Sequence, residues 1–362
     1  MNSSSDRHPI AGLAGVAVSL VCSSDRARAE QIAAILSGCP VAEAPVELDV
    51  GGDDGATFAV DLAEQIASDY EDGFAGNTVV ALEPGAELVE IALVFEHMLD
   101  ARRPRLPIGI RDVVVGTSVR EIGELLFGWA REKSPARRSV DFTSPGRLAS
   151  RLEFASMIVL TDVPDAAALA DTRVVLAFLS RMAPSALVLV PYDVANARQL
   201  SGLLVRGRAR RLGASMGWQR ELAEGAPAHP LSDQCSTFVF RDPRPFHPGR
   251  LNTAVTEGLT PDRVGCVARS RGFVRLATRG GRVGSWATAG EVLDLEPTEM
   301  LSWSADSPIG QEIVFFGPGL DQGALESILS ECLLTPEELA AGPEVWAHYP
   351  DPFPEWVVEH HH

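Results

Sequence analysis

The feature that most constrains the fold is an alternation of two patterns between Val16 and Pro191. Short apolar runs, typical of buried strands, alternate with longer segments whose apolar residues recur every three or four positions, as on one face of a helix. Strands that alternate with helices along a chain form βαβ units around a largely parallel sheet. The sequence therefore predicts an α/β fold with a parallel sheet and helices on both of its faces.

Turn residues and changes of period set the expected bounds of these elements. Gly38 suits the left-handed cap at the end of the first helix, and Pro104 and Pro107 end the third. Strands are predicted at 16–22, 77–82, 111–115, 157–161 and 186–190. Helices are predicted at 27–36, 58–66, 88–99, 119–133 and 165–182.

The pattern changes after this region, which indicates a second domain. Periodicity fades between Tyr192 and Asp233, and we expect a final helix and then a linker there. A compact α+β unit with several strands follows, with helices near 250–256 and 323–333. The predicted organisation is a polar tail at 1–15, an α/β domain at 16–225, a linker at 226–234, an α+β domain at 235–358 and the remains of an affinity tag at 359–362.

Charge and hydropathy exclude several classes of partner. The formal net charge of −18 repels nucleic-acid phosphates and anionic lipid, so no direct nucleic-acid contact is expected. The apolar runs stay far below the roughly 18 residues that cross a bilayer, and residues 1–6 are polar, unlike a secretory signal. We expect a cytoplasmic protein with no membrane contact. Its five cysteines are odd in number and far apart, which argues against disulfides and a closed zinc site.

Sequence motifs in the second domain carry a resemblance to a known family. Arg244-Pro-Phe-His-Pro-Gly-Arg250 is followed by Ala268-Arg-Ser-Arg-Gly-Phe273, then Trp286, then a segment from Gln311 to Gly317, then Asp351-Pro-Phe-Pro-Glu-Trp356. In this order the motifs resemble the C-terminal domain of CobW-type GTPases. The resemblance implies a P-loop-NTPase-like first domain and a C-terminal domain that faces a protein partner. The family-motif residues that would serve this contact are Arg244, His247, Arg250, Arg269, Arg271, Trp286, Glu312, Asp351 and Trp356.

The same residues also have structural interpretations. His247, between Pro245 and Pro248, is predicted to pack or to cap a helix rather than to bind a metal. Trp286 and Trp356 are predicted to anchor the core of the domain. Gly272 is predicted to allow a tight turn between strands.

The phosphate loop that the resemblance implies is missing from the first domain. Such a loop needs glycines, whose N–H groups cradle phosphate, and a lysine that neutralises it. The corresponding interval, 19–28, has neither, and Lys133 is the only lysine of the chain. The degenerate loop consists of Cys22, Ser23, Ser24, Asp25 and Arg26. Its Asp25 places a carboxylate where phosphates would bind, so we interpret Ser24 or Asp25 as a helix cap.

Two further family motifs are also absent. The Asn-Lys-x-Asp stretch that selects guanine is replaced by Thr161, Asp162 and the nearby Asp165. These acids could accept a hydrogen bond from a base, but capping of the following helix is the preferred interpretation. The Cys-x-Cys-Cys metal motif corresponds to residues 76–80, which contain no sulfur, so no metal ligand is assigned.

The resulting hypothesis is a non-catalytic CobW-like protein, not an enzyme, that acts as a scaffold or adaptor in zinc homeostasis. No cofactor is expected, although GTP and zinc stay open, and the expected partner is a protein bound by the C-terminal domain. One alternative is a diverged GTP-dependent metallochaperone. Another is a zinc-limitation adaptor that recruits a ribosome-hibernation factor. The sequence does not determine the oligomeric state.

Overall fold

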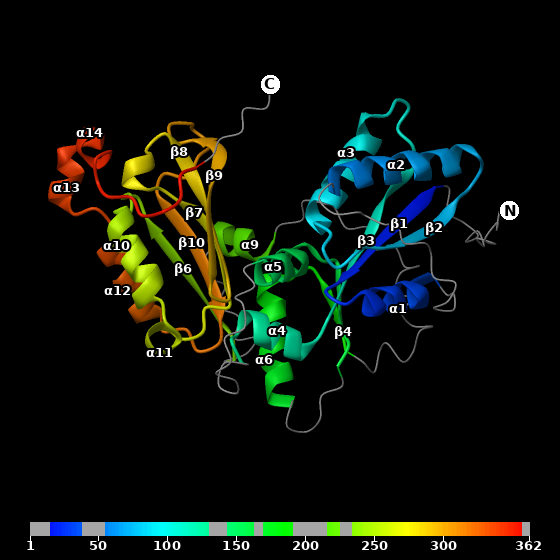
Figure 1. The fold of residues 1–362 in the computed structure, drawn as a ribbon, viewed down its shortest axis with the longest axis horizontal. Coiled ribbons are helices and arrows are strands. Elements are labelled where there is room, and N and C mark those ends of the chain that lie inside the picture. The colour runs from blue at the N-terminus through cyan, green and yellow to red at the C-terminus, as the bar shows by residue number, and fades with distance from the viewer. Residues whose placement is uncertain are drawn as a thin grey trace. The chain divides into compact units, whose positions relative to one another are not determined.

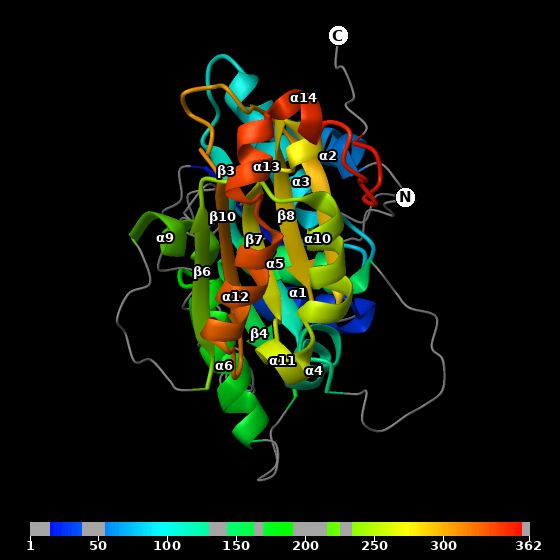
Figure 2. The same cartoon turned by 90° about the vertical axis from the view of Figure 1, so that its left-hand side faces the viewer.

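The structure is a computed structural model that describes residues 15–37, 55–129, 143–162, 169–190, 216–224 and 234–356 (Figures 1 and 2). The chain divides into two compact units. The first comprises Met1–Glu121, Ser150–Asp165 and Ser185–Ala214, and the second Ile122–Ala149, Ala166–Pro184 and Ser215–His362. None of the helices in the described ranges has both the length and the apolar character that a membrane span requires.

A five-stranded parallel sheet forms the centre of the first unit, as the sequence predicted. Its order is β2-β1-β3-β4-β5, and every neighbouring pair is parallel. The strands are β1 (Val16–Ser23), β2 (Gly76–Ala81), β3 (Ile108–Thr117), β4 (Met157–Leu160) and β5 (Leu187–Leu189).

Helices cover both faces of this sheet (Figure 1). On one face α1 (Arg26–Ser37) buries Ala29, Ile32, Ala33 and Leu36 against β1, β2 and β3. The other face carries α3 (Leu88–Ala101), which packs on β3 and on α2 (Gly55–Glu71). The remaining helices of this part of the sequence are α4 (Val119–Leu126), α5 (Ser144–Phe154) and α6 (Leu169–Met182).

Helix α4 is shorter than predicted. It ends at Leu126 rather than at residue 133, because Gly128 adopts a φ of 71° that favours glycine and breaks the helical path. The backbone N–H of Trp129 then bonds to the carbonyl of Gly123 at 3.0 Å. Residues 130–142 and 163–168 lie outside the described residues, so the remainder of the predicted helix at 119–133 and the start of the one at 165–182 are not described.

The strand order places a ligand-binding position at one edge of the sheet. From β1 the chain passes to β2 on one side, and β3 then lies on the other side of β1. In open parallel sheets such a reversal of strand order opens a crevice outside the carboxyl ends of the two strands. The carboxyl ends of β1 and β3, at Ser23 and Thr117, therefore mark the position where a ligand would bind.

The second unit contains an antiparallel sheet of order β6-β10-β7-β8-β9. Its strands are β6 (Ser236–Asp242), β7 (Arg269–Val274), β8 (Arg282–Ala289), β9 (Val292–Leu301) and β10 (Gln311–Gly317). The helices that follow β6 and β10 are α10 (Pro248–Thr253), α11 (Pro261–Val264), α12 (Gln322–Cys332), α13 (Pro336–Ala341) and α14 (Pro343–Trp346).

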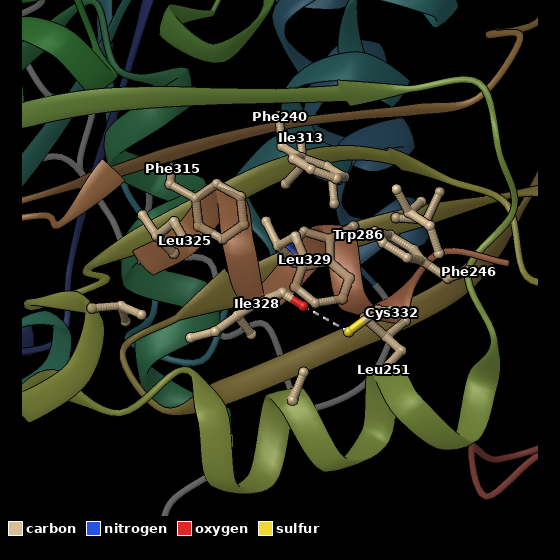
Figure 3. Packing of buried hydrophobic residues seen from close by; sticks show 14 of the residues in the cluster. Phe240, Phe246, Leu251, Trp286, Ile313, Phe315, Leu325, Ile328, Leu329 and Cys332 are labelled. Atoms are coloured by element: carbon tan, nitrogen blue, oxygen red, sulfur yellow. Dashed lines mark hydrogen bonds between the residues drawn. The ribbon is translucent and has the colours of Figure 1, made fainter. Parts of the chain in front are cut away.

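One face of this sheet packs against α10 and α12 to form the core of the unit (Figure 3). Phe240, Phe315 and Trp286 extend from the sheet, and Leu251 and Leu329 extend from the two helices. All of them are fully or almost fully buried. Burial of this apolar surface is the main source of stability of the domain.

Helix α9 (Gly217–Glu224) packs against β7 and β10. Its Trp218 ring lies edge-on to Phe273 at 5.7 Å, and the guanidinium of Arg271 lies 5.6 Å from the same indole. Gly272, between these two β7 residues, forms no turn. A Cβ at this position would lie 1.9 Å from the carbonyl oxygen of Glu312, so glycine is required for the close approach of β7 and β10.

Candidate functional site

The five residues of the degenerate phosphate loop lie between β1 and α1. Cys22 and Ser23 are the buried last residues of β1, Ser24 and Asp25 form an exposed link, and Arg26 opens α1. The link lies at the edge of the sheet where the strand order predicts a ligand. It contains no glycine, so any ligand-binding groups must come mainly from side chains.

The amino end of α1 is capped by an acid of its own. Asp25 Oδ1 accepts the backbone N–H of Arg28 at 3.4 Å, which confirms the predicted cap. A carboxylate here interacts favourably with the positive end of the helix dipole. Arg26 pairs with Glu30 at 3.1 Å and with Glu83 at 3.2 Å, and its side chain is 54% exposed.

A second carboxylate, that of Glu121, lies beside this cap. Glu121 belongs to the first turn of α4 and accepts hydrogen bonds from the Ser24 hydroxyl, from Arg28 Nη1 at 2.8 Å and from the Thr117 hydroxyl at 3.0 Å. The side chains of Glu121 and Arg28 are only 14% and 21% exposed. One cation and two hydroxyls thus converge on one anion at the carboxyl ends of β1 and β3.

Gly116 helps Arg28 to reach this position. It lies in β3 opposite α1, and a Cβ there would come within 3.4 Å of Cγ and Cδ of Arg28 and within 2.5 Å of Ile32 Cδ1. The missing side chain lets α1 approach β3 closely enough for the arginine stem to pass over the strand. Arg28 and Glu121 can then meet although they are 93 positions apart in the sequence.

Sequence analysis did not identify Arg28, Thr117 or Glu121 as site residues. One local signal was available, because Ser118 and Glu121 have the spacing of a capping box. Ser118 Oγ indeed accepts the backbone N–H of Glu121 at 2.9 Å. That signal locates the start of α4, but it does not predict the contact of Glu121 with α1.

Arg151 brings a second guanidinium to the same edge of the sheet. It belongs to α5 and is 4% exposed. Its Nη2 donates to the carbonyl oxygens of Pro84 and Ala86 at 2.7 Å each, and Nη1 donates to that of Ser23 at 3.4 Å. Its buried Nε has no hydrogen-bond partner among the described residues. The residue therefore holds the segment after β2 against the end of β1.

The predicted guanine-site residues occupy the neighbouring strand end. Thr161 follows β4 and donates from its hydroxyl to the carbonyl of Thr117 at 3.1 Å. Asp162 accepts the backbone N–H groups of Val119 at 2.9 Å and Arg120 at 3.2 Å. It therefore caps α4, because β3 and β4 are parallel and end side by side. The start of the helix that follows Asp162 lies outside the described residues, so the predicted cap there stays a prediction. Asp165 lies outside the described residues.

The described cysteines are free thiols with raised pKa values. Burial raises the pKa of Cys22 and Cys266 to about 11 and that of Cys235 and Cys332 to about 12. These free cysteines are therefore protonated near neutral pH. In the ranges that the structure describes, no group of three or more His, Cys, Asp or Glu residues could hold a metal ion. Cys39 lies outside these ranges.

The first family motif of the second unit surrounds the start of α10. Arg244 pairs with Asp242 at 2.9 Å. His247 Nδ1 accepts the backbone N–H of Arg250 at 3.4 Å, which confirms the predicted cap. Burial, and then the charge of Arg250, lower the pKa of His247 and favour the neutral ring that this cap requires. Arg250 itself donates to both oxygens of Glu338, at 2.9 and 2.7 Å.

The other family-motif residues are distributed over the sheet and the C-terminal segment. Trp286 is fully buried and donates from Nε1 to Ser270 Oγ at 2.7 Å, which confirms it as a core anchor. Arg279, in the short 3-10 helix between β7 and β8, pairs with Asp351 of the C-terminal segment at 2.8 Å and lies 4.7 Å from the ring of Trp356. Three more residues lie in strands: the buried Arg269 and the half-buried Arg271 in β7, and the half-buried Glu312 in β10.

The Arg250–Glu338 pair predicts a pH dependence of stability. Hydrogen bonds from Arg250 lower the pKa of Glu338 from 4.5 to about 2. Between these values the folded carboxylate stays ionised while the unfolded one takes up a proton, so the stabilisation is complete above 4.5 and is lost as pH falls towards about 2. We expect the free energy of unfolding of Glu338→Gln to approach that of the parent protein over this range.

Denaturant titrations at several pH values between about 6 and 3 measure this difference. Glu337→Gln provides the matched control, because Glu337 is exposed on the same helix. A difference between parent and Glu338→Gln that stays constant with pH would contradict the assignment.

Comparison with known proteins finds a family match within the second unit. The chain combines a parallel α/β unit with a unit whose antiparallel sheet carries α10 and α12 on one face. Residues 235–333 match the family of the cobalamin synthesis protein cobW C-terminal domain. The predicted resemblance to the C-terminal domain of CobW-type proteins is therefore confirmed over these residues.

Two relatives extend the match beyond this domain. "Zinc-regulated GTPase metalloprotein activator 1" of Dictyostelium discoideum is 31% identical over 160 residues, which cover 38% of this chain and 33% of that protein. This chain thus spans about a third of the length of that relative. "Zinc chaperone Rv0106" of Mycobacterium tuberculosis is 27% identical over 305 residues, or 78% of this chain and 72% of that protein. The crystal structure of Zn(II)-bound YjiA GTPase from E. coli aligns over 88% of this chain and 99% of its own, with 12% identity and a TM-score of 0.31.

These relatives correct one expectation and weaken another. The expectation that the chain is not an enzyme is contradicted, because one relative is named as a GTPase. Motif comparison led to the opposite conclusion because the interval at 19–28 contains neither glycine nor lysine. The expectation of no cofactor gains no support, since the relatives' names concern zinc and GTP.

Proposed function

We propose that this chain is a GTP-dependent chaperone for zinc, of the CobW type. The observation that carries this proposal is the convergence of Arg28, Ser24 and Thr117 on one carboxylate at the carboxyl ends of β1 and β3. An anion is thus already bound where an open parallel sheet binds ligands. The match to the CobW C-terminal domain and the names of the two relatives supply the chemical class of the ligand and cargo.

In this proposal the triphosphate of GTP is held by side chains rather than by a glycine loop. Phosphate oxygens, like the oxygens of Glu121, accept hydrogen bonds and carry negative charge. A guanidinium pairs with phosphate through two parallel bonds, so Arg28 supplies both charge and orientation. The hydroxyls of Ser24 and Thr117 supply two further donors. The C-terminal domain is, in the same proposal, the part that binds a protein partner.

Calorimetric titration of the full chain with GTP and Mg²⁺ tests the proposal. We expect saturable binding with a Kd of about 1 to 100 µM and release of inorganic phosphate above that of a protein-free control. The absence of saturable heat together with the absence of phosphate release would overturn the proposal.

Zinc is tested separately, as cargo. A chain without His360, His361 and His362 avoids binding by the terminal histidines, and a chromophoric chelator measures zinc affinity with and without GTP. If nucleotide controls cargo, GTP changes the zinc affinity, and zinc changes the GTP affinity by the same factor. Equal zinc affinities in the two conditions would contradict a GTP-dependent chaperone.

A further inference from the structure

The carboxylate of Glu121 occupies the donors that a phosphate group would use. It accepts from the Ser24 hydroxyl, from Arg28 Nη1 and from the Thr117 hydroxyl, and it is 14% exposed. A charged acceptor so far removed from water is favourable only because these three donors replace its hydration. A phosphate cannot use the same donors at the same time, since two anions at such close range repel strongly.

We propose that Glu121 is an internal gate: its carboxylate holds the anion position closed, and a phosphate-bearing ligand binds there only after displacing it. The inference rests on the proposed function, because the gated ligand is the nucleotide of that proposal. Its chemical class is a polyphosphate, recognised by the guanidinium and hydroxyl donors.

An independent observation supports a ligand at this edge. Arg151 is 4% exposed, and its guanidinium lies against the carbonyl of Ser23, directly beside the link to α1. Within the described residues its Nε has no hydrogen-bond partner, although a buried cationic donor without a partner is costly. With Arg28, it gives this edge two largely buried guanidiniums. Two carboxylates lie against this region: that of Glu121 pairs with the Arg28 guanidinium, and that of Asp25 accepts the backbone N–H of Arg28 at the start of α1.

The position of Glu121 at the start of α4 allows its side chain to change conformation. It is the third residue of α4, so a change of side-chain rotamer, without unfolding of the helix, withdraws the carboxylate. The backbone before Glu121 is held in place, because Thr117 ends β3 and Ser118 Oγ accepts the backbone N–H of Glu121. The Thr117 hydroxyl therefore stays in place when the carboxylate leaves.

Glu121→Gln and Glu121→Ala test the gate, with inorganic tripolyphosphate as the probe and calorimetry of the full chain as the measurement. Both variants are expected to bind tripolyphosphate at least about tenfold more tightly than the parent protein, because a competing charge is removed. Glu83→Gln is the matched control: it removes one carboxylate at the same edge, the partner of Arg26, and should change the affinity by less than about twofold. Glutamine keeps an acceptor for Ser24 and Arg28, so Glu121→Gln remains informative if the alanine variant misfolds.

The outcomes separate the gate from the proposed function. If the parent binds GTP and neither Glu121 variant binds tripolyphosphate more tightly than Glu83→Gln, the gate is wrong and the proposed function stands. If the Glu121 variants gain tripolyphosphate affinity while neither they nor the parent bind GTP, the gate stands and the proposed function fails. An equal gain in Glu83→Gln would show a general charge effect and overturn the gate.

Discussion

Replacing Trp286 with alanine is expected to destabilise the second unit by about 3 to 5 kcal/mol, the cost of removing a large aromatic side chain from a core. Trp286 is fully buried between the sheet and its covering helices. It packs in the cluster that contains Phe246, Leu251 and Leu329 (Figure 3). The indole also donates to Ser270 Oγ at 2.7 Å, so the substitution removes a buried hydrogen bond as well as apolar contacts.

Denaturant unfolding of the full chain, followed by far-ultraviolet circular dichroism, measures this loss. Trp303→Ala is the matched control, because Trp303 is 72% exposed and its removal should change the stability by less than about 0.5 kcal/mol. A shift of the unfolding midpoint that is equal in the two variants would show that Trp286 does not anchor the core.

Local sequence signals predicted the elements of the first unit well. The first strand, expected at 16–22, is β1 at Val16–Ser23, and the helix expected at 27–36 is α1 at Arg26–Ser37. These two predictions are correct because a buried strand leaves a short apolar run, and a helix with one buried face leaves a period of three to four residues, in the sequence. Helix α4 shows where prediction from this period fails: apolar residues continue beyond Leu126, but Gly128 ends the helix.

Contacts within a short segment were also predictable at the candidate site. Asp25 caps α1 and His247 caps α10, each from three residues before the N–H that it accepts. The structure shows contacts that the sequence did not predict where distant strands meet. Asp162 caps the helix of the neighbouring strand, and Gly272 allows β7 to approach β10. Such contacts depend on strand order and register, which leave no periodic mark in the sequence.

The contact between Glu121 and Arg28 belongs to the same long-range class, and it changes the interpretation of the missing motif. Comparison of motifs identified the absence of glycine and lysine from the link after β1. It did not reveal that an arginine from α1 and two hydroxyls supply donors at this position. A glycine-lysine loop and this arrangement both provide hydrogen-bond donors and positive charge, although the atoms that provide them differ.

Replacing Arg28 with alanine is expected to weaken the binding of GTP and of tripolyphosphate by about a hundredfold, at the upper end of the 1.5 to 3 kcal/mol of a hydrogen bond to a charged group. Two effects act in the same direction. The ligand loses a guanidinium that is 21% exposed and therefore weakly screened, and the Glu121 carboxylate stays behind without its cation. Because the proposal places Arg28 against phosphate and not against the base, both ligands should lose the same factor, as calorimetry can measure.

Arg26→Ala is the control for net charge, because Arg26 is 54% exposed and pairs with Glu30 and Glu83. It should weaken binding by less than about threefold. The double variant Arg28→Ala with Glu121→Ala separates the two effects, since residues in contact show non-additive changes. We expect Glu121→Ala to restore part of the affinity lost in Arg28→Ala, because it removes the unpaired carboxylate. Equal losses for Arg26→Ala and Arg28→Ala would place the phosphate elsewhere on the chain.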